Sequence, residues 1–158
     1  MPTPHYPPSV TSRKHFIGID PGAHGAVAVV DQAGSVLLLE DLPHGEDGRV
    51  HAAALACMLA GYDAPAVALE SPIAFTPNAY SMMALGCSFG MCLATLQCIG
   101  VEPLLPVPRS WKAKLQLTSD KTESVARARA LHPDLPKRLR HDKAEALLLA
   151  QYARVVSI

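Results

Sequence analysis

The chain has 158 residues and a formal net charge of zero, and about half of its residues are hydrophobic. This length and composition indicate one globular domain with a substantial core and exclude a protein of two large domains. The four cysteines form no C-x-x-C pair. This argues against a zinc site or a disulfide framework and favours buried thiols in a reducing compartment, the cytoplasm.

The first 14 residues are rich in proline and lack the apolar core of a secretory signal. They predict a disordered N-terminal arm over residues 1–14. Residues 15–158 are predicted to form a single domain, because no linker or internal repeat divides them.

Charge is distributed unevenly along the chain. Residues 109–143 contain ten Lys or Arg and four Asp or Glu, whereas the remainder has four basic and ten acidic residues, so the two parts carry +6 and −6. Such a basic run is compatible with a solvated helical surface. It is equally compatible with a face that contacts phosphates.

The apolar runs and the turn residues between them predict alternating strands and helices. In chain order, these are strands at residues 16–20, 26–31 and 35–40, a helix at 49–60, a strand at 66–70, a helix at 78–99, a strand at 103–107, a helix from Thr118 or Ser119 to residue 131, and a helix within 137–156. The order β-β-β-α-β-α-β-α-α predicts an α/β fold with a mixed five-stranded sheet and helices on both faces.

Residues 81–101 carry no charge over about the length of a membrane span. The segment is nevertheless rich in Gly, Ala, Ser and Cys, contains Gln97 and lacks flanking Lys or Arg. These features predict a helix buried at the centre of the domain and no association with a membrane.

Four acidic residues stand where such a fold would bring them together. Asp20 ends the first strand and Glu70 ends the fourth, while Asp142 and Glu145 lie three residues apart at the start of the last helix. Residues with this spacing share one helix face. Ligand sites in these sheets gather at the carboxyl ends of strands, so we expect the four carboxylates to converge.

Carboxylates that converge repel one another unless a cation lies between them. A set of carboxylates without accompanying Cys or His selects hard cations, here Mg²⁺ or Mn²⁺. Two such ions about 4 Å apart stabilise the attacking and leaving oxygens of an in-line displacement. The cluster therefore predicts metal-dependent hydrolysis of a phosphodiester.

The sequence around these acids carries three motifs: Gly18-Ile19-Asp20-Pro21-Gly22, Leu69-Glu70, and Asp142-Lys143-Ala144-Glu145-Ala146-Leu147. In order and spacing they resemble the RuvC-type Holliday junction resolvases of the RNase H-like superfamily. The resemblance extends from residue 16 to residue 152 and is greatest to the divergent members found in phages and prophages.

The resemblance implies an RNase H-like fold and a homodimeric, Mg²⁺-dependent endodeoxyribonuclease of DNA recombination and repair, which nicks opposing strands of a four-way DNA junction. Asp20, Glu70, Asp142 and Glu145 would be its catalytic metal ligands. Glu145 replaces the usual Asp and adds one methylene, so we expect an altered metal preference or rate.

The resemblance also implies residues that contact DNA. Lys112 and Lys121 would contact phosphates near the scissile bond as part of the catalytic set. Arg109 and Lys114 would extend the DNA-binding surface, and Phe75 would stack on bases at the junction centre. Ordinary surface lysines and a core aromatic are the alternatives for these positions.

Four further residues leave their roles open. Gly86 and Gly90 lie one helical turn apart and mark helix packing either within the domain or at the dimer contact. His24 and His141 flank the acidic positions, where they would shuttle protons, contact phosphate or remain ordinary surface histidines.

Other functions remain open from the sequence. The nuclease could act on other branched DNA or on structured RNA, because the RNase H-like fold hosts many nucleases. A catalytically weak junction-binding protein is a second alternative, against which the four intact acids argue. An actin-like ATPase would need two large domains, which 158 residues do not provide.

Overall fold

The computed structural model describes residues 14–22, 24–62, 66–72 and 78–157. The elements within these residues are β1 (Phe16–Asp20), β2 (Ala26–Val30), β3 (Val36–Asp41), α1 (Ala52–Leu59), β4 (Ala66–Leu69), α2 (Ala79–Cys98), α3 (Pro108–Lys114), α4 (Lys121–Leu131) and α5 (His141–Ser157). All but one residue of the predicted N-terminal arm lie outside the described residues.

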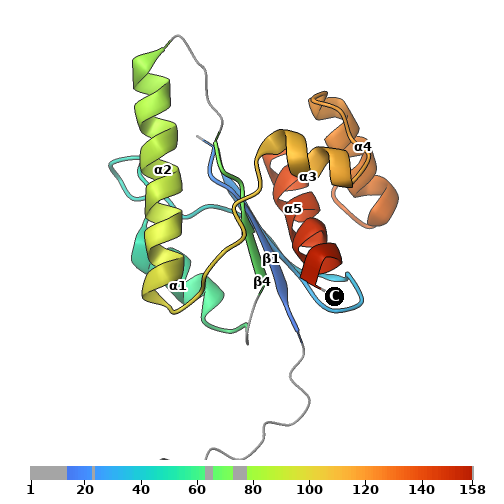
Figure 1. Cartoon of the computed structure of the whole chain (residues 1–158), viewed down its shortest axis with the longest axis horizontal. Coiled ribbons are helices and arrows are strands. Elements are labelled where there is room, and N and C mark those ends of the chain that lie inside the picture. The colour runs from blue at the N-terminus through green and yellow to red at the C-terminus, as the bar shows by residue number, and fades with distance from the viewer. Residues whose placement is uncertain (1–13, 23, 63–65, 73–77, 158) are drawn as a thin grey trace, which may run out of the picture.

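The strands form one mixed sheet with the order β3-β2-β1-β4. β1, β2 and β3 pair antiparallel in chain order, and β4 joins β1 in parallel, so the sheet is mixed, as predicted. α5 covers one face of the sheet, while α1 and α2 cover the other (Figure 1). The predicted α/β fold with helices on both faces is therefore observed.

The predicted fifth strand at residues 103–107 is not confirmed. Only Leu104 pairs with β4, through its N–H to Val67 at 2.8 Å and its carbonyl to the N–H of Leu69 at 2.9 Å. Pro103 and Pro106 flank it, and proline has no N–H with which to continue a ladder. The described part of the sheet therefore has four strands.

Two differences concern the helices that follow. The seven-residue α3 was not predicted, although it begins with Pro108, a residue that suits the first helical turn. α4 begins after Asp120, whose carboxylate accepts the N–H of Thr122 at 2.8 Å. Thr118, one of the two predicted starting residues of this helix, instead bonds Glu123 through both its N–H and its hydroxyl at 2.8 Å.

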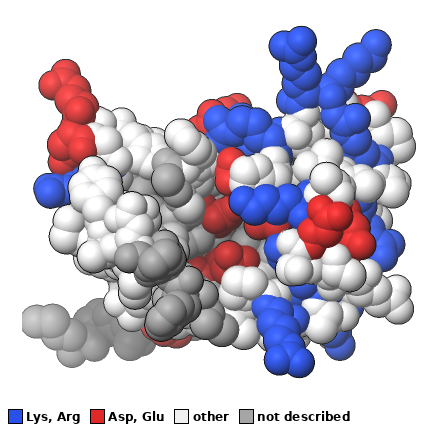
Figure 2. Space-filling view, turned by 90° about the horizontal axis from the view of Figure 1, so that it is seen from above, with Lys and Arg blue, Asp and Glu red and all other residues white. Residues whose placement is uncertain are grey.

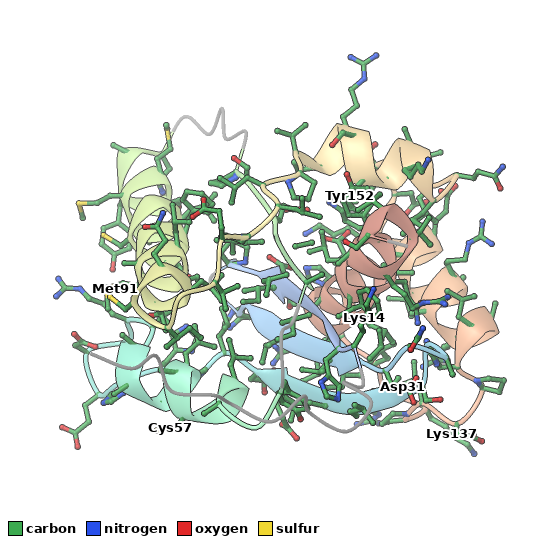
Figure 3. All side chains as sticks on the ribbon, turned by 60° about the horizontal axis from the view of Figure 1, so that its bottom comes forward. Lys14, Asp31, Cys57, Met91, Lys137 and Tyr152 are labelled. Atoms are coloured by element: carbon green, nitrogen blue, oxygen red, sulfur yellow. The ribbon has the colours of Figure 1, made fainter. Side chains whose placement is uncertain are left out.

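The prediction that α2 is a central buried helix is wrong. The helix is long and apolar enough to cross a membrane, yet only 17% of its most apolar window is buried. Cys92, Thr95 and Leu96 anchor its C-terminal half to the core, while Tyr80 and Met83 are 74% and 62% exposed. Figure 3 shows sulfur-bearing side chains on the side of α2 that faces away from the sheet.

The cysteines are free thiols, as predicted, but Cys92 alone among them is buried. Cys57, Cys87 and Cys98 are exposed because they lie on the outer sides of α1 and α2. The prediction of four buried thiols was therefore wrong for three of them.

Candidate active site

The alternation of side chains along β1 directs Asp20 toward α5. Ile17 and Ile19 pack into the core on the α1–α2 side of the sheet, so Gly18 and Asp20 face the other side. Gly18 brings α5 very close: a Cβ at this position would lie 2.0 Å from the carbonyl oxygen of Ala146. The missing side chain thus allows the helix to approach the strand that carries Asp20.

Glu70 lies beside Asp20 because β4 runs parallel to β1. Leu69 pairs with Ile19, and the N–H of Glu70 continues the ladder by donating to the carbonyl of Ile19 at 3.0 Å. Leu69 packs on the α1–α2 side, so the next side chain, Glu70, faces α5. The carboxyl ends of two adjacent strands therefore place two carboxylates together.

The start of α5 adds the other two carboxylates. Asp142 and Glu145 are 8% and 7% exposed, and Asp20 is 7% exposed. Figure 2 looks onto this end of the molecule, where acidic atoms lie recessed between two lobes of the surface. The structure thus brings together the four acids that the sequence singled out.

The electrostatics of Asp20 reflect this crowding. Burial, followed by the charge of Glu70, raises the pKa of Asp20 from 3.8 to about 7. Glu145 and Asp142 raise the pKa further, while the N–H of Gly22, 3.0 Å from Oδ1 of Asp20, opposes the change. The other three carboxylates therefore all lie near enough to Asp20 to raise its pKa.

Two consecutive residues of α3 contact two of the carboxylates. The indole N–H of Trp111 donates to Oε2 of Glu70 at 2.6 Å. Nζ of Lys112 donates to Oε1 of Glu145 at 2.6 Å, and Ser124 of α4 donates to the same oxygen at 3.1 Å. Helices α3 and α4 thus supply donors to the acidic cluster.

Glu70 experiences opposing effects. Burial is the largest and raises its pKa above the usual value, and the charge of Glu145 acts in the same direction. The hydrogen bond from Trp111 and the charge of Lys112 lower the pKa. The direction of the net shift is upward, so desolvation outweighs the donors from α3.

Asp142 lies beside a histidine and an arginine. Nε2 of His141 lies 2.9 Å from its Oδ1, and Nε of Arg140 lies 3.7 Å from its Oδ2. Nζ of Lys121 lies 3.2 Å from Nε2 of His141, which places Lys121 at the edge of the cluster. Arg140 also pairs with Asp41 at 2.9 Å and so ties the start of α5 to β3.

Solved structures match this chain over most of its length. T. thermophilus RuvC in complex with a Holliday junction substrate superposes with a TM-score of 0.72 and 21% identity, covering 90% of this chain and 95% of that chain. The fold is that of RuvC. A second Thermus thermophilus RuvC structure gives a TM-score of 0.68 and 23% identity, with the same coverage.

The likeness to RuvC shows the fold alone. Sequence identity below a quarter does not show that two proteins share an activity. A comparison with family models finds no match, and a comparison with curated proteins finds none either.

The donor set of this RuvC fold suits a hard divalent cation. Among the described residues, no group of three or more His, Cys, Asp or Glu side chains is already arranged around one point as metal ligands. One oxygen of Glu70 and one of Glu145 are engaged by α3 and α4 instead. Burial and, after it, the charges of the neighbouring carboxylates nevertheless raise the pKa of Asp20. Oxygen donors of this kind favour Mg²⁺ or Mn²⁺.

The predicted DNA-contacting residues divide into two groups. Lys112 and Lys121 contact members of the acidic cluster or the histidine beside it. Arg109 and Lys114 are exposed on α3, and Lys114 lines a separate hollow beside Arg127 and Arg154. The predicted base-stacking residue, Phe75, lies outside the described residues.

The remaining predicted positions also have defined surroundings. His24 is exposed, and its backbone carbonyl accepts a hydrogen bond from Arg140 at 2.9 Å. A Cβ built on Gly86 or Gly90 would meet nothing within 4 Å in the described chain. These two glycines therefore do not mark a close contact with another described element of the domain.

Three residues of the site were not predicted from the sequence: Trp111, Ser124 and Arg140. The tryptophan offered a signal, since it is the single one in the chain and buried indoles ordinarily find an acceptor. Ser124 offered none, because a serine within a helix is ordinarily unremarkable.

Proposed function

We propose that this protein is a metal-dependent endodeoxyribonuclease that resolves four-way DNA junctions. The observation that carries the proposal is the convergence of four carboxylates at the ends of β1 and β4 and the start of α5. The RuvC fold supports it, since a structure that the chain resembles over 90% of its length is RuvC in complex with a Holliday junction substrate.

The metal ligands are proposed to be Asp20, Glu70, Asp142 and Glu145. Bound there, Mg²⁺ or Mn²⁺ supplies positive charge to the phosphate oxygens of an in-line displacement. The protein contributes a recessed site and strands that fix two of the carboxylates (Figure 2). The start of α5 fixes the other two, and the helix dipole favours negative charge at this end.

Lys112 and Lys121 are proposed to orient the scissile phosphate. Lys121 lies at the edge of the cluster, where its ammonium is accessible to a strand that enters the recess. The side chain of Lys112 is only 11% exposed and pairs with Glu145. It therefore neutralises part of the acidic charge that would otherwise repel a phosphate.

The DNA strands on either side of the recess would lie on the basic part of the surface. Lys and Arg side chains gather on the side of the recess formed by α3 and α4 (Figure 2). Arg109 and Lys114 belong to this part of the chain and are proposed as further DNA contacts. Phosphate contacts of this kind make affinity fall as salt concentration rises.

The proposed homodimer would form through α2. The exposed Tyr80, Met83 and Met91 lie on this helix, and Gly86 and Gly90 leave open space between them. A partner helix could approach closely at the two glycines and cover the apolar side chains. If a second copy covers the apolar side of α2, this side needs no membrane to cover it. We therefore propose a cytoplasmic protein of DNA recombination and repair that does not associate with a membrane.

The test compares three labelled substrates in Mg²⁺: a four-way junction, a flap and a linear duplex. We expect wild type to cut the junction in preference to the others. Asp20→Asn should abolish cutting, whereas Asp134→Asn, at an exposed aspartate outside the cluster, should leave it intact. Equal cutting of all substrates would contradict junction selectivity, and cutting by Asp20→Asn would contradict the metal site.

The same assay addresses the alternative functions. A structured RNA added to the substrate set tests whether the nuclease acts on RNA. Binding of the junction without cutting in either Mg²⁺ or Mn²⁺ would identify a catalytically weak junction-binding protein.

A further inference from the structure

Helix α3 delivers two donors to the acidic cluster from neighbouring positions. Trp111 contacts Glu70, the residue after β4, and Lys112 contacts Glu145 on α5, each at 2.6 Å. β4 pairs with β1, the strand that carries Asp20. A helix of only seven residues thus links two of the structural elements that build the site.

Trp111 is the more rigidly held of the two residues. Its side chain is fully buried in the core cluster that contains Phe16, Ala128 and Leu147. An indole has one donor, Nε1–H, and no acceptor. Its N–H therefore fixes one defined oxygen of Glu70, Oε2, while the ring is fixed by packing.

A carboxylate held by one oxygen is restrained in position and can use its other oxygen for a further partner. The described residues make no hydrogen bond to Oε1 of Glu70. We propose that Trp111 is a positioning residue, which holds Glu70 by Oε2 and leaves Oε1 available to a divalent cation that would bind at the acidic cluster. This inference rests on the metal site of the proposed function and assigns to the tryptophan a role that its neighbour Lys112 does not have.

The physical basis is the same as at other metal sites. Groups that hydrogen-bond a ligand fix its orientation before the metal arrives, and their loss commonly weakens metal binding 10–100-fold. Hydrogen bonds to charged acceptors are also the stronger ones, since the carboxylate contributes a full charge. Trp111→Phe removes the N–H and leaves a ring in the same cavity, so it isolates this contact.

The first experiment measures Mg²⁺ binding calorimetrically, without DNA. We expect Trp111→Phe to raise the Kd for Mg²⁺ about tenfold. Val30→Ala is the matched control, because Val30 belongs to the same core cluster but pairs with Phe16 at the far end of β1. It should bind Mg²⁺ like wild type. An unchanged Kd in Trp111→Phe would overturn the proposal.

A double-mutant cycle tests whether Trp111 acts through Glu70. In the Glu70→Gln background, Trp111→Phe should change the Kd for Mg²⁺ less than threefold, because the carboxylate that it positions is gone. A tenfold loss that persists in this background would overturn the proposal. In the cleavage assay, excess Mg²⁺ should restore kcat of Trp111→Phe, with KM for the junction unchanged.

The fluorescence of Trp111 in the wild-type protein gives a further test, which remains informative if Trp111→Phe fails to fold. Trp111 is the single tryptophan of the chain, so its fluorescence reports on its surroundings alone. Mg²⁺ should shift the emission with the Kd found by calorimetry, and Glu70→Gln should abolish the shift. If calorimetry detects Mg²⁺ binding but the emission of Trp111 does not change, the proposal is overturned.

The outcomes separate this inference from the proposed function. Mg²⁺ binding that depends on Trp111, together with a junction that stays uncut, would uphold the inference and overturn the nuclease. Junction cutting with Mg²⁺ binding that is indifferent to Trp111 would do the reverse. A wild-type protein that binds no Mg²⁺ would overturn both.

Discussion

Two features of the surroundings of Asp20 disfavour its ionised form when no cation is bound. Asp20 is almost fully buried, and it lies beside three other carboxylates. Ionisation of a buried carboxylate loses hydration and adds repulsion, so both effects favour the protonated form. The acidic cluster therefore weakens the fold that carries it unless a cation offsets the charge.

These two effects predict how stability depends on pH. The folded-state pKa of Asp20, about 7, is raised from 3.8, so its stabilising contribution is full below pH 4 and is lost as pH rises through 7. The shift corresponds to roughly 4 kcal/mol at 1.36 kcal/mol per pH unit. Urea unfolding in EDTA should show wild type losing more stability than Asp20→Asn between pH 4 and pH 8. Parallel curves for the two proteins would contradict the raised pKa.

Lys112 is expected to stabilise the metal-free site. Its ion pair with Glu145 is largely buried, and removing one partner of a buried pair leaves an uncompensated charge at a cost of roughly 3 kcal/mol. Lys112→Met should therefore lower the free energy of unfolding by about that amount. Lys114→Met, at an exposed lysine of the same helix, is the control and should have little effect.

The second half of this test is a compensating change. Glu145→Gln removes the charge that Lys112→Met leaves unpaired, so the double variant should recover most of the lost stability. If the two losses simply add in urea unfolding, the ion pair is not what stabilises this region.

At the scale of residues, the four acids could be predicted from the sequence. The residues that donate hydrogen bonds to them could not. Asp20 and Glu70 could be found because each ends an apolar run, and strand ends are readable locally. The contact between Trp111 and Glu70 joins residues 41 positions apart. It depends on how α3 packs, and no local pattern carries that information.

At the scale of elements, the approach of α5 to β1 controls the site. A Cβ on Gly18 would lie 2.0 Å from the carbonyl oxygen of Ala146 and 2.2 Å from the backbone nitrogen of Ala150. Both atoms belong to a helix backbone, so neither can move aside without moving α5. The same helix carries Asp142 and Glu145, so packing and chemistry are coupled here.

Gly18→Ala should therefore destabilise the fold and disturb the site together. We expect a loss of about 3 kcal/mol or more in urea unfolding, because overpacking against backbone is costly. The remaining folded protein should bind Mg²⁺ more weakly than wild type. Gly61→Ala is the control, since a Cβ there meets nothing within 4 Å in the described chain. A Gly18→Ala protein as stable as wild type would contradict this packing.

The elements that were predicted wrongly share a physical cause. α3 has seven residues, too few for a helical period to emerge from the sequence. The segment at residues 103–107 has the composition of a strand, but its two prolines limit it to one bridging residue. α2 has the apolar content of a buried helix, and content alone does not tell whether the sheet or a second surface covers it.

At the scale of the whole molecule, opposite charges are concentrated in different parts of the chain. Residues 109–143 carry a charge of +6 and the remainder −6. Basic side chains gather on one side of the recess in which the acids lie (Figure 2). A polyanion would be attracted to that side and held with its phosphates next to the acids, so the neutral total does not argue against a nucleic-acid partner.

The oligomeric state in solution tests whether a second copy binds the exposed side of α2. Apolar side chains such as Met83 remain exposed on a helix that is anchored to the core only through its C-terminal half. If a second copy covers them, wild type should have a mass in solution of twice 16.8 kDa by light scattering. Gly86→Glu places a charge and a bulky side chain at the proposed contact, where no described residue lies within 4 Å of its Cβ. It should therefore yield a folded monomer.

A monomeric variant would separate the proposed metal binding from the proposed junction cutting. Mg²⁺ binding should survive in Gly86→Glu, because the acids lie on β1, β4 and α5 and not on α2. Paired nicking of the two opposing strands should be lost, because one site remains per particle, and single nicks should persist at a reduced rate. Gly61→Glu controls for the added charge, since that position is also open in the described chain. A wild-type protein that is monomeric at assay concentration, or a Gly86→Glu protein that stays dimeric, would exclude α2 as the contact.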